Sequence, residues 1–359
     1  MVIFNDPRNQ NHEGKGFLGL NTYRLQLCLG VFWGIIRGEV IGQSSKEHDI
    51  PIICIGNITA GGTGKTPHTE YLLYLLCDKK TAVLSRGYNR KTKGLVWVDV
   101  NSKPNNVGDE PLQIKQKHPK TLVLVSENRR KGIEEILKQY PETEVILMDD
   151  GFQHRWIKAG LNIVLNNYNN PIYSDHLLPY GSLREKKSEL QRADIIITSK
   201  CPEMTPTEKI GINNQLNISA HQNSFFSSII YNNWESIFTD EAISINDKYH
   251  IILVTSVANA NNLKLHLEET GHIVNHLRFP DHYSFTKKDI QNILSEYYSI
   301  TSDKNIILST EKDKVKLTNF KTEFDGIKLF FIPINIKIDR EQEFNKLITD
   351  YVTNHKRNR

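Results

Sequence analysis

The chain has 359 residues, of which 38% are hydrophobic and 24% are charged. At about 150 residues per domain, this length predicts two or three domains with buried cores. The composition excludes a polytopic membrane protein, a disordered polyampholyte and a collagen-like fibre. The 45 basic and 41 acidic residues leave a net charge of +4, which is too small to indicate a nucleic-acid-binding protein. An anionic small molecule or an anionic membrane surface suits this mild basic excess.

Cysteine usage indicates a reducing compartment. The four cysteines (Cys28, Cys54, Cys77 and Cys201) show no CxxC pattern and no paired spacing. This scatter predicts neither a disulfide framework nor a zinc site.

Residues 1–50 differ from the rest of the chain and form a separate N-terminal segment. Within it, an apolar stretch at 25–36 (LQLCLGVFWGII) lies between Arg24 and Arg37. The stretch is far shorter than the ~20 residues that a membrane-spanning helix needs, and no small-residue cleavage site follows it. Two interpretations stay open: a helix packed on the protein's own core, or a helix lying in a bilayer interface.

Short apolar runs alternate with amphipathic stretches from residue 51 onward. Several runs are continuously apolar, as is typical of strands buried on both faces of a parallel sheet. The pattern predicts a doubly wound, mostly parallel α/β sheet over 51–215. The predicted strands are 52–55, 82–84, 122–125, 145–148, 163–165 and 195–198, and the predicted helices are 65–77, 109–117 and 129–139.

A smaller α/β unit is predicted over 216–359. Residues 202–250 are rich in Asn and Ser and contain few apolar runs, which indicates a boundary within them. A second alternation of strands and helices follows. Its predicted strands are 251–254, 273–277, 306–308 and 329–332, and its predicted helices are 260–270, 286–298 and 340–352.

The strongest local signal is a glycine-rich turn between the strand 52–55 and the next helix. Glycines let successive backbone N–H groups point at phosphate oxygens, and the helix N-terminus adds its positive dipole end. The turn departs from G-x4-GK-[ST] because Thr59 stands where a glycine is expected. We expect Lys65 to reach the β- and γ-phosphates of a nucleotide and Thr66 to contact Mg²⁺. The other expected nucleotide-binding residues are Gly61, Gly62, Thr63 and Gly64.

This motif makes the predicted fold P-loop NTPase-like; the alternative, a strand–helix turn with glycines for steric reasons, is weaker because strand and helix flank the turn correctly.

A second signal is the strand 145–148, which runs into Asp149 and Asp150. In a P-loop sheet, a neighbouring strand that ends in Asp supplies a contact to Mg²⁺. A plain Asp-Asp-Gly turn is the alternative for this pair.

Two further patterns are weak on spacing alone. Asp109 opens a predicted helix in the run 108–111, where it could simply cap the helix. His282 lies in the loop 279–283, where a lone histidine is more often a polar surface residue. For Asp109 and for His282, the residues by themselves leave both a functional and a purely structural role open.

Taken together, the motifs resemble the tetraacyldisaccharide 4'-kinase family of the lipid A pathway in Gram-negative bacteria. The resemblance covers about residues 50–317, and its motifs follow one another in the family's order. These motifs are GNITAGGTGKTP (56–67), LSRGY (84–88), VGDEP (107–111), DDGFQH (149–154), LPYGSLRE (178–185) with RAD (192–194), FPDHY (279–283) and TEKD (310–313).

The resemblance implies phosphorylation of the 4'-hydroxyl of a tetraacyldisaccharide 1-phosphate by ATP, at the cytoplasmic face of the inner membrane. A peripheral enzyme with a lipid-linked disaccharide substrate, and without an obligatory protein partner, is expected. Asp149, Asp150, Thr66 and Glu110 would organise Mg²⁺. Asp109 and His282 would form the pair that activates the sugar hydroxyl. Because these two belong to different predicted domains, we expect them to meet when the cleft closes.

A P-loop nucleotide switch, such as a membrane-associated ATPase or GTPase, is the alternative function. Switches of this class usually carry a lysine directly before the two glycines of the loop. Ala60 stands at that position and argues against this class.

Overall fold

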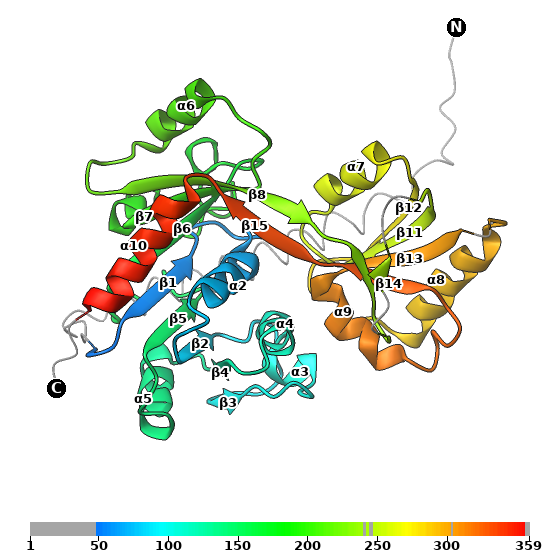
Figure 1. Cartoon of the computed structure of the whole chain (residues 1–359), viewed down its shortest axis with the longest axis horizontal. Helices are drawn as coiled ribbons and strands as arrows, with labels where there is room; N and C mark the ends of the chain where they lie inside the picture. The colour runs from blue at the N-terminus through cyan, green and yellow to red at the C-terminus, as the bar shows by residue number, and fades with distance from the viewer. Residues whose placement is uncertain (1–47, 240–241, 244–246, 303, 356–359) are drawn as a thin grey trace, which may run out of the picture.

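The computed structural model describes residues 48–239, 242–243, 247–302 and 304–355. They form two α/β lobes, joined by two strands that run from one lobe toward the other (Figure 1). The predicted N-terminal helix at 25–36 lies outside the described residues. Within the described residues, no helix combines the length and the apolar character that crossing a bilayer requires.

The P-loop lobe is built on a nine-stranded sheet in the order β15-β8-β7-β6-β1-β5-β2-β4-β3. Its central pairs are all parallel, and only the pairs that the edge strands β15 and β3 make are antiparallel. This confirms the predicted doubly wound, mostly parallel sheet. The strands are β1 (Ile52–Gly56), β2 (Thr81–Ser85), β3 (Val96–Trp97), β4 (Leu122–Val125), β5 (Val145–Asp149), β6 (Leu161–Asn167), β7 (Ile195–Ser199), β8 (Asn223–Tyr231) and β15 (Ile334–Ile338).

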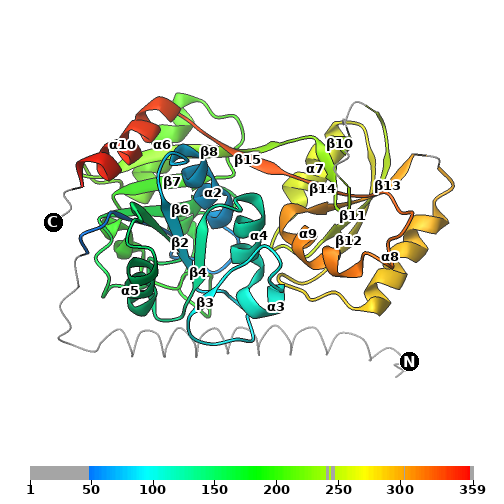
Figure 2. The same cartoon turned by 60° about the horizontal axis from the view of Figure 1, so that its bottom comes forward.

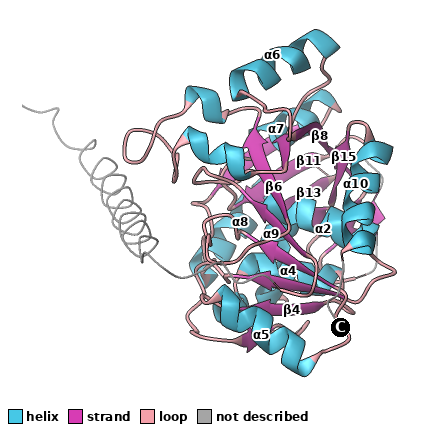
Figure 3. Cartoon of the chain, turned by 90° about the vertical axis from the view of Figure 1, so that its left-hand side faces the viewer, coloured by secondary structure: helices cyan, strands magenta, loops and turns pink. Residues whose placement is uncertain are grey.

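Helices cover both faces of this sheet, so every residue of β1, β2, β5 and β7 is buried. Apolar residues of α2 (Lys65–Leu75), α4 (Asp109–Lys117) and α10 (Glu341–Asn354) share one core with one face of the sheet. Those of α5 (Arg129–Gln139) and α6 (Pro206–Leu216) share the core of the other face. Figure 3 shows this layering of helices around the strands. A short helix, α3 (Pro104–Val107), directly precedes α4.

The second lobe contains a six-stranded sheet in the order β10-β9-β14-β13-β11-β12. Its central strands are parallel, while β9 and β10 pair antiparallel at one edge. The strands are β9 (Trp234–Ser236), β10 (Ala242–Ile243), β11 (His250–Thr255), β12 (Ile273–Arg278), β13 (Asn305–Thr310) and β14 (Leu329–Ile332), and the helices are α7 (Asn261–Glu269), α8 (Lys287–Ser299) and α9 (Glu311–Leu317).

The division expected between residues 215 and 216 does not follow the sheets. Both β8 and β15 pair within the larger sheet, and α10 packs on that sheet rather than on the smaller one. The chain therefore crosses between lobes twice, after β8 and after β14. The predicted boundary is misplaced for two reasons. The apolar stripe of α10 predicts a helix but does not specify which sheet the helix covers. The serines of β8 interrupt its apolar run, so the sequence pattern does not indicate a strand there.

Candidate active site

A cleft of about 2530 Å³ lies between the lobes. Its walls include the loops that follow β1, β2 and β5 in the P-loop lobe and those that follow β11, β12 and β13 in the second lobe. In open α/β sheets, ligands bind at the carboxyl ends of the strands. Both sheets direct these ends to one cleft, which is why motifs far apart in sequence converge there.

The glycine-rich turn leads from β1 into α2, as predicted. Gly64 precedes the helix with φ 92, a left-handed conformation that glycine adopts without steric cost. The buried Asn57 amide donates to Thr59 Oγ1 at 3.3 Å and to Thr63 Oγ1 at 3.0 Å. Thr59 is not among the described residues with positive φ, so its position does not require the glycine of the strict motif.

His68 fixes the start of α2 and has no counterpart among the sequence-based expectations. Its Nδ1 lies 2.7 Å from the Gly64 carbonyl oxygen, and its Nε2 lies 2.9 Å from Ser227 Oγ on β8. Burial lowers the pKa of His68 to about 4, so the ring is neutral. The Nδ1–H therefore donates to Gly64, and Nε2 accepts from Ser227, which ties the turn to the sheet.

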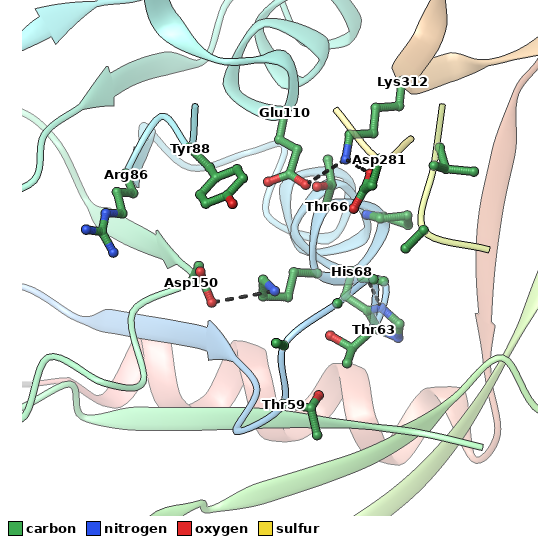
Figure 4. A pocket seen from close by; sticks show the side chains of 18 of the residues that line it. Thr59, Thr63, Thr66, His68, Arg86, Tyr88, Glu110, Asp150, Asp281 and Lys312 are labelled. Atoms are coloured by element: carbon green, nitrogen blue, oxygen red, sulfur yellow. Dashed lines mark hydrogen bonds and ion pairs between the residues drawn. The ribbon is translucent and has the colours of Figure 1, made fainter. Parts of the chain in front are cut away.

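Lys65 and Asp150 both line the cleft and form an ion pair, with Lys65 Nζ 3.5 Å from Asp150 Oδ1; a dashed line marks this pair at Asp150 in Figure 4. Arg184 donates to both carboxylate oxygens of Asp150, at 3.0 and 3.4 Å. Burial acts to raise the pKa of Asp150, but Arg184 and Lys65 outweigh it and hold that pKa well below its usual range. Asp150 is thus a fixed anion beside the Lys65 ammonium.

Asp149 is almost fully buried, and one of its carboxylate oxygens has no hydrogen-bond partner among the described residues. Ser85 donates to its Oδ2 at 3.1 Å, whereas no described residue donates to Oδ1. Burial, followed by the charges of Glu110 and Asp150, raises the pKa of Asp149 to about 7. A buried carboxylate oxygen without a donor is a suitable ligand for a divalent cation.

Asp109 and His282 come together from opposite lobes. His282 Nδ1 lies 3.3 Å from Asp109 Oδ2, and the His282 backbone N–H donates to the Ser256 carbonyl oxygen at 3.2 Å. Burial acts to raise the pKa of Asp109, but the His282 hydrogen bond and the charge of Lys316 outweigh it and lower that pKa. Asp109 is therefore an anion that faces the imidazole of the other lobe.

Lys312 and Lys316 of α9 surround this pair; Lys312 lies in the TEKD motif of the family resemblance, but neither lysine was assigned a role from the sequence. Lys312 Nζ lies 3.1 Å from His282 Nε2, 3.4 Å from Glu110 Oε1 and 3.3 Å from Asp281 Oδ1 (Figure 4). Because an ammonium only donates, Nε2 accepts from Lys312, and the Nδ1–H of His282 donates to Asp109. Lys316 Nζ lies 3.7 Å from Asp109 Oδ2.

Asp313 holds Lys316 in this position. Its carboxylate is fully buried, pairs with Lys316 Nζ at 2.8 Å and accepts from the Ser256 backbone N–H at 2.9 Å. Thr310 Oγ1 donates to it at 2.8 Å. The TEKD motif thus supplies a buried anchor, Asp313, and a cation at the cleft, Lys312.

The family model for Tetraacyldisaccharide-1-P 4'-kinase matches residues 29–353. The chain belongs to this kinase family. Curated tetraacyldisaccharide 4'-kinases are similar over almost their whole length. The relative from Phocaeicola vulgatus is 39% identical over 91% of this chain and 90% of its own, and that from Flavobacterium johnsoniae is 38% identical over 86% and 89%.

A solved structure of a member of this family has a similar fold. The "apo" form of LpxK from Aquifex aeolicus in complex with ATP is 27% identical, covers 93% of this chain and 98% of its own, and superposes with a TM-score of 0.68. The resemblance and the fold class expected from the sequence are confirmed. The comparisons favour the kinase family over a nucleotide switch.

Within this kinase fold, Gly108 places Asp109. Gly108 has φ 93 and ψ 154, a region essentially reserved for glycine. A Cβ there would lie 3.1 Å from Gly87 Cα and 3.2 Å from the Tyr88 carbonyl oxygen. We expect Gly108→Ala to lower the free energy of unfolding by about 1–3 kcal/mol and to reduce kcat, because Asp109 is displaced. Urea unfolding and kinase assays measure both effects.

Gly211→Ala in α6 is the matched control for that substitution. Apart from its chain neighbours and the backbone of α6 itself, no described atom lies within 4 Å of the Cβ it would add. Alanine in a helix interior is favoured over glycine by about 0.5–1 kcal/mol, so stability should be unchanged or raised. Equal stability of Gly108→Ala and the unaltered chain would contradict the strain argument.

Proposed function

We propose that this protein transfers the γ-phosphoryl group of ATP to the 4'-hydroxyl of a tetraacyldisaccharide 1-phosphate, a step of lipid A biosynthesis. The observation that carries the proposal is the Asp109–His282 pair, 3.3 Å apart between two lobes, at the same cleft as a phosphate-binding turn. Membership of the 4'-kinase family supports the same reaction and the same acceptor.

The nucleotide is proposed to bind at the turn that precedes α2. The backbone N–H groups of 61–64 and the N-terminus of α2 face the phosphates, and Lys65 offsets charge on the β- and γ-phosphates. The ATP-bound structure in the family supports ATP as the donor. Phosphoryl transfer depends more on positioning and charge neutralisation than on covalent chemistry by the protein.

Mg²⁺ is proposed to bind next to these phosphates. The unmatched Oδ1 of Asp149 fits a divalent cation, and Asp150, Thr66 and Glu110 complete the proposed ligand set. Among the described residues no cluster of three or more His, Cys, Asp or Glu side chains is arranged to hold a metal alone. Mg²⁺ commonly uses one or two carboxylates together with substrate phosphates, which this arrangement fits. Bound there, the ion would neutralise charge on the phosphates.

The Asp109–His282 pair is proposed to take the proton of the sugar hydroxyl. Asp109 stays ionised and holds the imidazole so that its Nδ1 carries the hydrogen, which leaves Nε2 as the basic atom. Nε2 now accepts from Lys312, so Lys312 must turn aside for the hydroxyl to reach it. A positioned base of this kind contributes about 100- to 10,000-fold to the rate.

The decisive experiment incubates the purified protein with γ-labelled ATP and tetraacyldisaccharide 1-phosphate in mixed micelles. We expect label on the 4' position of the sugar, located by mass spectrometry of the product. ATP hydrolysis at the same rate with and without the sugar lipid, and no labelled lipid, would instead identify a nucleotide switch.

We also propose that the enzyme works as a peripheral protein at the cytoplasmic face of the inner membrane. Four acyl chains hold the substrate in a bilayer, so the sugar must be phosphorylated at the interface. The apolar stretch 25–36 between two arginines is the proposed docking segment.

Deleting residues 1–40 is expected to weaken association with vesicles while nucleotide binding survives, because the phosphate-binding turn lies outside the deleted part. Co-sedimentation with anionic vesicles and a fluorescent-nucleotide titration measure the two properties. Unchanged co-sedimentation of the truncated protein would remove the segment from this role.

A further inference from the structure

Three helices begin at the cleft, and one lysine, Lys117, contacts or belongs to all three. The helices are α2, α4 and α9, which start at Lys65, Asp109 and Glu311. Lys117 is the last residue of α4, at the end opposite Asp109. Figure 2 shows α4 lying against α9 where the two lobes meet.

The Lys117 ammonium contacts both lobes. Its Nζ lies 2.8 Å from Glu70 Oε2 on α2 and 2.9 Å from Glu311 Oε1 on α9. It also donates to the Ile334 carbonyl oxygen at 3.4 Å, where the chain crosses back from the second lobe. The three donors of one ammonium thus reach the P-loop helix, the second lobe and the crossover.

The ion pairs of Lys117 with Glu70 and Glu311 are largely shielded from water, so solvent screens their attraction less than it would at the surface. The side chains of Glu70, Glu311 and Lys117 are 6%, 11% and 28% exposed. Gln113 donates to Glu70 Oε1 at 2.8 Å, so α4 satisfies both oxygens of that carboxylate. Burial, then the charge of Glu311, raises the pKa of Glu70 to about 7. Burial acts to lower the pKa of Lys117, but Glu70 and Glu311 outweigh it and raise that pKa.

The helix that supplies the negative charge changes along the contact between α4 and α9. At its cleft end, Asp109 and Glu110 face Lys316 and Lys312; at its far end, Lys117 faces Glu311. The two ends are about 12 Å apart at 1.5 Å per residue. A shift of α9 along α4 would bring like charges together, so this pattern favours a single alignment of the two helices.

We propose that Lys117 is a positioning residue: through Glu311 it sets the alignment of the lobes at which His282 and Lys316 reach Asp109. The assignment rests on the proposed kinase function, because the alignment matters only if that pair acts on the substrate. Lys117 itself touches no reacting atom and acts through α9. Displacements of about 1 Å at a reacting centre can cost 100-fold in rate, so a modest loosening is measurable.

Glu311→Gln is the sharpest test, because it removes the pair between lobes and leaves Lys117 paired with Glu70 inside the P-loop lobe. We expect kcat to fall about ten-fold with the KM for ATP unchanged. Glu323→Gln is the matched control: it removes a 3.0 Å pair with Lys287 that lies wholly within the second lobe, and kcat should stay within about two-fold.

A double variant separates positioning from general destabilisation. If Glu311 acts only by assembling the Asp109–His282 pair, Glu311→Gln should cause no further loss in an Asp109→Asn background. A loss that persists there, or wild-type kcat in the single variant, would overturn the proposal.

Two further measurements keep this test independent of folding and of the proposed function. Should Glu311→Gln unfold, Lys117→Met against Lys117→Arg makes the same comparison: methionine should reproduce the loss, and arginine, which keeps the charge, should restore most of the rate. Equal rates for these two variants would also overturn the proposal. Failure of the unaltered protein to label the sugar lipid would instead refute the kinase function.

Discussion

Replacing Asp109 with asparagine is expected to lower kcat at least about 100-fold while ATP still binds. The substitution keeps the shape of the side chain but removes the anion that accepts from His282 Nδ1 at 3.3 Å. An amide can present either its oxygen or its NH₂ group to the imidazole, so the tautomer that leaves Nε2 basic is no longer enforced. Single-turnover phosphoryl transfer and a separate ATP titration measure the two effects.

Asp281→Asn is the matched control for that prediction. Asp281 also belongs to the cleft, with its Oδ2 3.9 Å from His282 Nε2, but it contacts the ring on the side of Lys312. Removing its charge should cost less than about ten-fold, because it does not orient Nδ1. Near-normal turnover in Asp109→Asn would exclude Asp109 from proton transfer and leave His282 without an orienting partner.

The secondary structure of both lobes follows from local patterns in the chain. Continuous apolar runs mark β1, β5 and β7 because their residues are buried on both faces. The amphipathic period marks α5, whose Ile133 and Ile136 face the core. Where a strand departs from these patterns, as β8 does with serines at 224, 227 and 228, the periodicity does not indicate a strand, and the domain boundary predicted from it differs from the one in the structure.

Some residues of the candidate site could likewise be predicted from local patterns, and others could not. Lys65, Asp149 and Asp150 could be predicted because a glycine-rich turn and a strand end place them at one edge of a sheet. The pairing of Asp109 with His282, which are 173 residues apart, could be expected only from the family resemblance. Their roles stay predictions, whereas their convergence is a property of the fold.

The residues that support the site were not foreseen, for a physical reason. His68 meets Ser227 from 159 residues away, and Lys312 meets Glu110 from 202 residues away. Lys312, although part of the TEKD motif, and Lys316 both fit the ordinary charged surface pattern of a short helix. Only the approach of the two lobes brings Lys312 to Glu110 and Lys316 to Asp109, and sequence periodicity carries no information about that approach.

The second large effect is expected at Lys65, where Lys65→Ala should lower kcat at least about 100-fold. Loss of one preorganised donor to developing charge typically costs about 3–4 kcal/mol of barrier, which corresponds to that factor or more. The turn itself should stay folded, because Asn57 still bonds Thr59 and Thr63 and Asp150 keeps its two contacts with Arg184. The KM for ATP should rise as well, since Lys65 is proposed to contact the phosphates already in the ground state.

Lys200→Ala tests whether any lysine at the turn has this effect. Lys200 Nζ donates to the Gly62 carbonyl oxygen at 2.7 Å, so it contacts the turn through its backbone rather than from the side of Asp150. Its removal should change kcat less than about ten-fold. Because the unfolding midpoints of both variants should lie within about 2 °C of the unaltered protein, comparable losses of kcat in the two would indicate general loosening of the turn. A selective loss in Lys65→Ala identifies the ammonium 3.5 Å from Asp150 as the group that offsets phosphate charge.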